Sequence, residues 1–286
     1  MSEKLTYTIL SATVDFLENY SEGDSVSNSA AEIGHTGIET VKNFLSSLQL
    51  IEKNGIIKEG FFKNCGMTLA QQVIIEFTKK FKPVWLSKLS IGASGLAALE
   101  VEDPSAHQCL EMAEVFVPEG EELSDAADIF LTELNILYRD GNNQESRRSI
   151  ETGRRGERLS FEIEKKENRT TPIQHYLLDN EVGYDLELKL PKKKRYIEVK
   201  SSEQSISRAV AHVSRYQINT AKDISKLDKH EYFFHFWSFA KGKERFAKID
   251  YQSISPFIAK EKKGMEIPQQ SIFFRNFEDY FQEKRD

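Results

Sequence analysis

Two short strand-like segments, separated by a lysine-rich stretch, constrain the fold of this chain more than any other feature of its sequence. Residues 183–186 are Gly-Tyr-Asp-Leu, and residues 196–200 are Tyr-Ile-Glu-Val-Lys. In both segments β-branched, aromatic and aliphatic residues alternate with polar ones, a pattern that predicts strands. Between them, Pro-Lys-Lys-Lys-Arg at residues 191–195 predicts a turn with a solvated edge. We therefore expect the two segments to pair as a hairpin.

The predicted hairpin gathers charged side chains on one face. Successive side chains of a strand point to opposite faces, so Glu198 and Lys200 share a face, and Asp185 on the first strand can join them. Two carboxylates and an ammonium group then converge where a divalent cation can bind, because hard cations prefer oxygen ligands. The backbone carbonyl of Val199 can provide one more oxygen. The plainer alternative is a solvated pair of Glu198 and Lys200, which contributes about 1 kcal/mol at most.

An acidic residue, a gap and then Glu-X-Lys on a strand resemble the active-site pattern of the PD-(D/E)XK nucleases. Three further segments extend this resemblance in the same order along the chain. They are residues 156–164 (beginning Gly-Glu), residues 214–217 (Ser-Arg-Tyr-Gln) and the aromatic segment 232–237. Together the segments resemble the domain at the C-terminal end of the No Vein protein, which recurs in many bacterial restriction-associated proteins. The resemblance covers residues 150–240, about a third of the chain.

The resemblance implies a metal-dependent DNA endonuclease that hydrolyses phosphodiester bonds in a restriction or antiphage defence system. It implies Mg²⁺ as the cofactor, with Mn²⁺ able to substitute, held by Asp185, Glu198 and the carbonyl of Val199. Lys200 would orient or activate the attacking water, or stabilise the developing charge. Gln217 stands where glutamate is common in relatives, and we include it among the catalytic residues. A plain surface glutamine is the alternative at that position.

A third carboxylate is expected from a long helix predicted at residues 145–167. Glu157 and Glu164 fall on one face of this helix. We favour Glu157 as the catalytic and metal-binding carboxylate, and Glu164 is the second choice. The first half of the helix is basic, and it either faces water or contacts phosphates near the acidic site. The residues expected to contact DNA are Lys42, Asn43, Arg154, Arg155, Lys193, Lys194 and Arg215.

Residues 1–62 predict a winged helix-turn-helix domain. Apolar residues recur at helical spacing in the segment 7–20, and two shorter helices are expected after it. Ser27 or Asn28 would cap the second helix and Thr36 the third. The pair Asn54-Gly55 predicts a tight turn between two short strands, which would form the wing. In such domains the third helix enters the major groove, although winged helices also serve as dimerisation or protein-docking modules.

The remaining chain predicts two further regions. Residues 63–147 are expected to form a helical connector with helices at 68–82, 106–117 and 122–138, the last capped by Ser124. Residues 148–286 would form the nuclease domain. The expected fold is therefore α/β, with a restriction-endonuclease-like mixed sheet flanked by helices. An α+β winged-helix domain and the helical connector would precede it.

Composition narrows the class of protein. At 286 residues and 39% hydrophobic content, the chain can bury a sizeable core. Its two cysteines, Cys65 and Cys109, lack CxxC spacing, which argues against a zinc site or a disulfide framework. No apolar run approaches the roughly 18 residues of a membrane span, so we expect a cytoplasmic protein without a membrane partner.

The expected partners follow from charge and from the implied reaction. A net charge of −6 does not exclude nucleic acid, because local basic patches matter more than the total. We expect DNA as a partner, other subunits of a defence complex, and a homodimer, since one active site cuts one strand. A non-cleaving DNA-binding or regulatory subunit that docks on a larger defence complex is the alternative function. The intact set of two carboxylates and a lysine favours cleavage over this alternative.

Overall fold

The structure, a computed structural model, divides into two compact units that are described separately. One unit contains residues 1–118 and 122–141, and the other contains residues 119–121 and 142–286. Within the described residues, every helix is too short or too polar to cross a lipid bilayer. The residues that the structure describes are 4–33, 37–62, 66–89, 93–116, 122–139, 144–175, 182–259 and 268–283.

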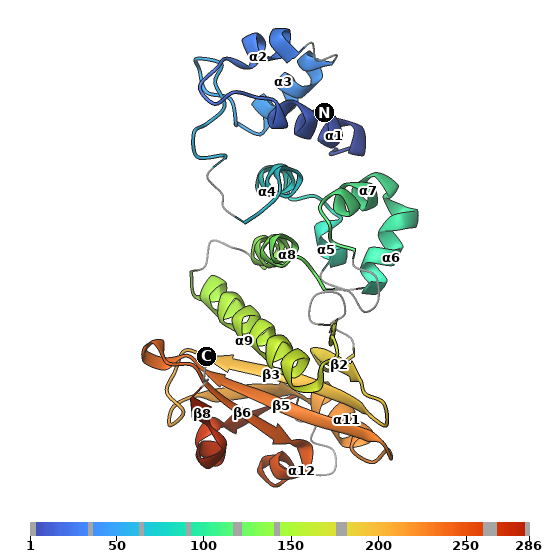
Figure 1. The fold of residues 1–286 in the computed structure, drawn as a ribbon, viewed down its shortest axis with the longest axis vertical. Helices are drawn as coiled ribbons and strands as arrows, with labels where there is room; N and C mark the ends of the chain where they lie inside the picture. Colours follow the sequence, from blue (N-terminus) through green and yellow to red (C-terminus); the bar gives the residue numbers. More distant parts are fainter. Residues whose placement is uncertain are drawn as a thin grey trace. The chain divides into compact units, whose positions relative to one another are not determined.

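The first unit begins with three short helices and a tight turn (Figure 1). The helices are α1 (Tyr7–Glu18), α2 (Val26–Ile33) and α3 (Ile38–Ser47). After α3, Ile51 and Ile57 form an antiparallel bridge on either side of the Asn54-Gly55 turn. The three predicted helices and the predicted hairpin turn are therefore present, and apolar residues of α1 and α3 are buried between them.

The N-caps of α2 and α3 differ from the prediction. Helix α2 starts at Val26, and the Asn28 N–H donates to Ser25 Oγ at 3.2 Å, so neither Ser27 nor Asn28 is the cap. The reason is tertiary: Val26 is fully buried, and Ser25 is held in a backbone bridge to Ile56. Gly37 occupies the N-cap of α3 with a φ of 90°, in the left-handed region that glycine tolerates. Thr36, the predicted cap, lies outside the described residues.

The rest of the first unit is helical. Helix α4 packs against both α1 and α8. The side chains of Thr68 and Gln71 form a reciprocal capping box at the start of α4, and Ser124 caps α8 as predicted. A further helix, α6, covers a stretch for which no element was predicted, because its glycine and serine residues resemble a loop. The bounds are α4 (Leu69–Phe81), α5 (Leu86–Leu89), α6 (Ala93–Glu102), α7 (Pro104–Met112) and α8 (Asp125–Tyr138).

The second unit is built on a mixed sheet, six-stranded among the described residues, with order β1-β2-β3-β5-β6-β8. Strands β3 and β5 are parallel, and the other neighbours are antiparallel. Strands β4 and β7 pair separately as a two-stranded sheet. The bounds are β1 (Ile173–Gln174), β2 (Leu186–Lys189), β3 (Lys194–Ser202), β4 (Val210–Ser214), β5 (His230–Ser238), β6 (Arg245–Asp250), β7 (Gln269–Phe273) and β8 (Gln282–Glu283).

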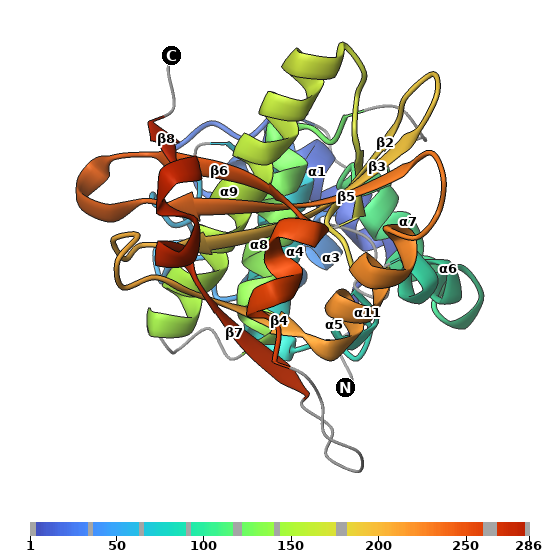
Figure 2. The same cartoon turned by 90° about the horizontal axis from the view of Figure 1, so that it is seen from below.

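Helices cover both faces of the six-stranded sheet (Figures 1 and 2). Helix α9 crosses one face, where the indole N–H of Trp237 donates to Ser160 Oγ at 2.8 Å. The opposite face carries the main core, in which Tyr232, Phe234 and Phe236 pack with buried residues of α11 and of the 3₁₀ segment η3. The expected mixed sheet flanked by helices is confirmed. The bounds are α9 (Gln144–Asn168), α11 (Arg215–Ile224), α12 (Tyr251–Ile254), η1 (Ala240–Gly242), η2 (Ser255–Phe257) and η3 (Phe274–Tyr280).

The predicted hairpin forms between β2 and β3, and its lysine-rich segment is solvated only at Pro191 and Lys192. The turn is closed by a backbone hydrogen bond from the Leu190 N–H to Lys193 O at 2.9 Å. Lys194 and Arg195 already belong to β3, an interior strand of the sheet. Glu187 and Glu164 pair with their side chains at 2.9 Å each, so the strand can extend through both charged residues.

Helix α9 approaches the sheet closely at Gly156. A Cβ atom at this position would lie 1.9 Å from Ser201 Oγ and 3.2 Å from Trp237 Cδ1. Rotation of the Ser201 hydroxyl can relieve the first contact, but Ser201 Cβ also lies 3.2 Å from this position and Trp237 is fully buried, so the helix or the sheet would have to shift. At Gly153, one turn earlier, a Cβ atom would meet nothing within 4 Å. The first of these glycines is therefore required by packing, whereas the second is not.

We expect Gly156→Ala to lower the free energy of unfolding by about 1–3 kcal/mol, the usual result of overpacking. Gly153→Ala is the matched control and should raise this energy by up to about 1 kcal/mol, because alanine favours helix over glycine. Urea denaturation of both variants measures the two effects. Equal shifts in the two variants would contradict the close approach at Gly156.

A buried ion cluster anchors the C-terminal part of α9 to the sheet. Glu164 is fully buried and lies 2.9 Å from Arg195 Nη1, 3.3 Å from His235 Nε2 and in direct contact with Lys248 Nζ. Burial alone would raise the pKa of Glu164, but the hydrogen bonds and charges of His235 and Lys248 outweigh it and hold the pKa well below its usual range. Glu164 is thus an ionised anchor between helix and sheet.

We expect Glu164→Gln to destabilise the second unit by about 3–5 kcal/mol, because Arg195 and Lys248 would lose their buried counter-charge and keep only the more exposed carboxylates of Glu231 and Glu167. Glu167→Gln is the control on the same helix. Glu167 also contacts Lys248, at 3.3 Å, but its side chain is 54% exposed, so the change should cost about 0.5 kcal/mol. Thermal denaturation followed by circular dichroism compares the two variants, and similar melting temperatures would refute the anchor role.

Candidate active site

The hairpin brings Asp185 and Glu198 to adjacent positions. Asp185 directly precedes β2, and its backbone N–H donates to Ile197 O at 2.8 Å. The paired register ends at Leu186 and Ile197, and this bond joins Asp185 to β3 one residue off that register, with Asp185 close enough for the charge of Glu198 to raise its pKa. The Val199 N–H then donates to Asp185 Oδ2 at 2.6 Å. The orientation of the Asp185 carboxylate is therefore fixed by the backbone of β3.

Lys200 and Gln217 complete the cluster around Glu198. Lys200 Nζ lies 2.8 Å from Glu198 Oε1, and Gln217 Nε2 donates to the same oxygen at 2.5 Å. The amide oxygen of Gln217 accepts from Lys200 Nζ at 3.3 Å and from the Ser214 N–H at 2.9 Å. Ser214 and Gln217 form the capping box of α11, which fixes the amide at the start of the helix. Gln217 thus positions both Glu198 and Lys200.

Burial and mutual repulsion shift the titration of this cluster. Burial raises the pKa of Asp185 to about 8, and the charge of Glu198 adds to the rise. Burial also raises the pKa of Glu198, against the opposing charge of Lys200. Burial would lower the pKa of Lys200, but the two carboxylates outweigh it and raise that pKa instead. Lys200 is consequently charged at neutral pH, and the raised pKa values mean that the two carboxyl groups retain a proton there rather than carrying two full negative charges.

The first half of α9 contributes a second charged pair. Glu157 Oε2 lies 3.0 Å from Arg154 Nη1. The charge of Glu157 contributes to the raised pKa of Glu198, and that of Arg154 opposes the rise in the pKa of Asp185. Glu157 is therefore the helix carboxylate whose charge acts on the acidic pair, whereas Glu164 lies in the buried ion cluster described above. Arg154 is buried, so the basic half of α9 does not simply face water as one of the sequence interpretations had it.

The other residues expected to contact DNA are divided between the two units and have different neighbours. Arg155 is half-exposed, stacks on Phe239 at 4.4 Å and pairs with Glu244 at 2.7 Å. Lys193 Nζ lies 2.5 Å from a carboxylate oxygen of Glu231. In the first unit, the Lys42 ammonium donates to Ser27 Oγ at 3.2 Å and Asn43 is exposed. In the second unit, Lys194 pairs with Glu187 and Arg215 lines a pocket that is described below.

The acidic pair suits a divalent cation in chemistry and charge. Within the described part of the chain, no three His, Cys, Asp or Glu side chains are grouped so that they could hold a metal ion. Mg²⁺, however, is usually bound by one or two carboxylates, with water and substrate phosphates as its other ligands. Asp185 and Glu198 provide two such carboxylates, and a cation would relieve the repulsion that raises their pKa values. The carbonyl of Val199 stays a predicted ligand.

Tyr216 is a neighbour of the site that the sequence did not single out. Its side chain is 54% exposed, and a Cβ atom at Gly183 would lie 3.0 Å from its ring. Gly183 has a φ of 76°, and its carbonyl accepts from the Tyr232 hydroxyl at 2.6 Å. Tyr216 therefore stands beside the segment that leads into Asp185. Tyr216 stands between Arg215 and Gln217 in the Ser-Arg-Tyr-Gln motif, and this position could have identified it as a neighbour of the site.

The comparison with protein families bears on the same part of the second unit. Residues 156–247 match the family model of the C-terminal domain of protein NO VEIN. This match confirms the resemblance to the No Vein C-terminal domain. It begins at Gly156, where α9 meets the sheet, and includes Asp185, Glu198, Lys200 and Gln217. It covers about a third of the chain, so it describes only the centre of the second unit. No curated protein and no solved structure matches the chain.

Proposed function

We propose that the chain is a metal-dependent DNA endonuclease of the PD-(D/E)XK type. The observation that carries this proposal is the paired carboxylates Asp185 and Glu198, with Lys200 and Gln217 in direct contact with Glu198. Two carboxylates in repulsion are unfavourable in a protein that only needs to fold, which is why such pairs suggest a functional site. The order of these residues along a No Vein-like domain supports the same conclusion.

The roles of the side chains follow from their contacts. Asp185 and Glu198 would hold Mg²⁺, or Mn²⁺ in its place. When bound, the metal ion would polarise the scissile phosphate and lower the pKa of the attacking water. Lys200 is charged and fixed between Glu198 and Gln217, so it would stabilise negative charge on the phosphate rather than accept a proton. Glu157 would add negative charge from α9, while its pair with Arg154 limits the repulsion.

The same proposal assigns a fold to each of the two units. The second unit would be a restriction-endonuclease-like domain, with α9 and α11 on opposite faces of its sheet. The first three helices and the turn after them would form a winged helix that presents Lys42 and Asn43 of α3 to DNA. A restriction or antiphage defence system would be the biological setting. Double-strand cleavage by one site per chain would require a homodimer.

A second candidate function is a non-cleaving DNA-binding or regulatory subunit of a larger defence complex. The observation that favours it is the small number of acidic ligands, because the described residues provide two carboxylates at the site and no third in a metal-binding arrangement. Such a subunit would bind DNA or its partner without a metal requirement.

Cleavage of supercoiled plasmid DNA tests the proposed function. Purified protein is incubated with plasmid in Mg²⁺ or Mn²⁺ and, separately, in EDTA. The proposal predicts nicked or linear product only with metal, and none from the Asp185→Asn or Lys200→Ala variants. Cleavage that persists in both variants would refute the proposed site. Absence of cleavage by the wild-type chain on supercoiled, linear, single-stranded and methylated DNA would favour the regulatory subunit.

A further inference from the structure

A pocket of about 380 Å³ lies on the side of α11 that faces away from the acidic site. Arg215, Ile218, Asn219 and Lys222 of α11 recur three or four residues apart, so they form one face of this helix. Gln217, which contacts Glu198, projects from the opposite face. Residues of α12, η2 and β7 form the other walls of the pocket. The volume lies within the range of small-ligand pockets, about 300–1,000 Å³.

The lining of this pocket has the chemistry of an anion site with an aromatic wall. Arg215 and Lys222 are cations, and none of the described lining residues is acidic. Asp223 and Asp250, which neighbour Lys222 and Tyr251 in sequence, are not among the described lining residues; Asp223 pairs with Lys226 at 2.7 Å, and its charge also acts on Tyr251. Tyr251 and Pro256 provide flat apolar surface, and Asn219 and Ser255 provide hydrogen-bonding groups. A nucleotide carries a phosphate and a flat base with polar groups at its edge, and the pocket offers a matching group to each of these.

The walls of the pocket are held by hydrogen bonds that do not involve a ligand. The side-chain amide of Gln270 on β7 accepts from the Ala259 N–H at 2.8 Å and donates to Ala259 O at 3.0 Å. The Arg215 N–H donates to Pro268 O at 2.9 Å, which ties the start of α11 to the residue before β7. The shape of the pocket is thus fixed before any ligand binds, which lowers the entropic cost of binding.

We propose that this pocket binds one unpaired nucleotide of a DNA strand, with its phosphate near Arg215 and Lys222 and its base against Tyr251. The identity of the strand as substrate rests on the proposed function above. An unpaired nucleotide is required because the base of a paired one is held in the duplex stack and cannot reach a pocket wall. Helix α11 has ten residues and is therefore about 15 Å long. A strand held on one face of this helix lies within a few nucleotides of the acidic site on the other.

Binding of a short fluorescein-labelled single-stranded DNA, measured by anisotropy in EDTA, tests this pocket without cleavage. Lys222→Glu should weaken binding by about tenfold or more and lower the slope of log affinity against log salt by about 0.7 or more. Tyr251→Leu keeps apolar volume but removes stacking, so it should weaken binding about fivefold or more without changing that slope. Unchanged melting temperatures show that both variants are folded.

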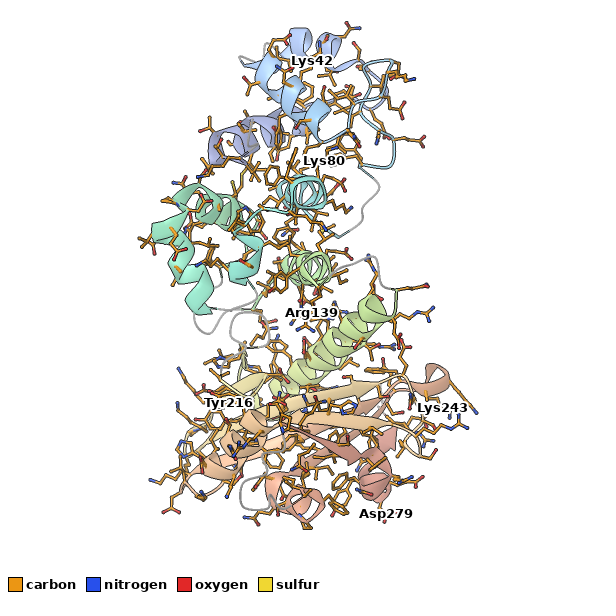
Figure 3. All side chains as sticks on the ribbon, turned by 180° about the vertical axis from the view of Figure 1, so that it is seen from behind. Lys42, Lys80, Arg139, Tyr216, Lys243 and Asp279 are labelled. Carbon is orange, nitrogen blue, oxygen red and sulfur yellow. The ribbon has the colours of Figure 1, made fainter. Side chains whose placement is uncertain are left out.

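Lys243→Glu is the matched control. This lysine is exposed and pairs with Glu283 at 3.2 Å. It lies at the opposite end of the sheet from Tyr216 of α11 (Figure 3). Its substitution changes the net charge by the same amount as Lys222→Glu and should leave the affinity unchanged. Equal losses of DNA affinity in Lys222→Glu and Lys243→Glu would refute nucleotide binding in the pocket, because they would show that only the overall charge matters.

Four further outcomes decide the proposal. Duplex DNA that competes as well as single-stranded DNA would overturn the requirement for an unpaired nucleotide. In another outcome, a free deoxynucleoside monophosphate binds in a way that depends on Lys222, while Lys222→Glu leaves the affinity for single-stranded DNA unchanged. That result would contradict strand binding and would indicate a pocket for a small ligand. If Lys222→Glu nicked plasmid at the wild-type rate with an unchanged KM, nucleotide binding in the pocket would be refuted, but the proposed nuclease function would not. Strand binding that depends on Lys222 in a chain that never cuts DNA would support the pocket and refute the nuclease.

Discussion

Replacing Asp185 by asparagine is expected to abolish metal-dependent cleavage and, at the same time, to stabilise the metal-free protein. Asparagine has the same shape and can still accept the hydrogen bond from the Val199 N–H, but it carries no charge. Loss of a group that acts electrostatically in a buried site lowers kcat by about 10²–10³-fold, and a metal ligand should lie at the upper end of this range. Removing one of two repelling carboxylates should raise the free energy of unfolding by about 1–3 kcal/mol.

The gain in stability from Asp185→Asn should depend on pH in a defined direction. The pKa of Asp185 is raised from 3.8 to about 8 by burial and by Glu198. Between these values the folded protein binds more protons than the unfolded chain, so the wild-type protein loses stability as pH rises. The asparagine side chain does not titrate, and the advantage of the variant should therefore grow from pH 4 to pH 8. Melting temperatures in EDTA at several pH values measure this difference.

Asp223→Asn is the control for this experiment. Asp223 is on α11 and fully exposed, and its pKa is lowered by the hydrogen bond and charge of Lys226. Its substitution should leave cleavage unchanged and should not stabilise the protein. If Asp185→Asn were also without effect on stability at pH 8, the repulsion between Asp185 and Glu198 would be refuted. If it cleaved DNA at the wild-type rate, Asp185 would not be a metal ligand.

Replacing Lys200 by alanine is expected to abolish cleavage with the opposite effect on stability. Lys200 Nζ lies 2.8 Å from Glu198 Oε1, and the Glu198 side chain is only 2% exposed. Without the ammonium group, two carboxylates remain without a nearby lysine charge, and breaking a buried pair of this kind costs about 3–5 kcal/mol. Metal should recover part of this loss, because a bound cation restores positive charge. Melting temperatures with and without Mn²⁺ measure both effects.

Lys200→Arg tests whether a positive charge at this position is sufficient or whether cleavage needs the ammonium group itself. Arginine keeps the positive charge, so most of the stability lost in Lys200→Ala should return. Cleavage should stay low, because the planar guanidinium group cannot occupy the place of a compact ammonium group between Glu198 and Gln217. Wild-type turnover in Lys200→Ala would refute any role of this residue in the reaction. Full activity in Lys200→Arg would show that charge alone is sufficient.

The parts of this fold that depend on short-range patterns could be predicted from the sequence. Strand alternation placed Glu198 and Lys200 on one face of the sheet, and the hairpin brought Asp185 close to Glu198. The segment Ser-Arg-Tyr-Gln predicted a helix start, and its capping box directs Gln217 toward Glu198. Each of these features depends on residues that are close in sequence or joined by a tight turn.

The parts that the sequence left open or missed depend on contacts between distant residues. Glu157 and Glu164 share one face of α9, and the contacts of Glu164 with Arg195 and Lys248 on the sheet show which of them is an anchor. Lys194 was expected in a turn because its partner, Glu187, could not be identified before the strand register was known. The cap of α2 moved to Ser25 because the backbone of that residue pairs with Ile56, 31 positions later. Local patterns carry no information about such pairings.

Calorimetric titration of Mn²⁺ into the metal-free protein tests the central claim most directly, because it requires no knowledge of the substrate. The account predicts binding to the wild-type chain that strengthens as pH rises toward 8, since the metal must displace a proton from the Asp185–Glu198 pair. It predicts little or no binding to Asp185→Asn and unchanged binding to Asp223→Asn. Equal binding to the wild type and to Asp185→Asn, or no binding to the wild type at any pH, would contradict a metal site at these two carboxylates.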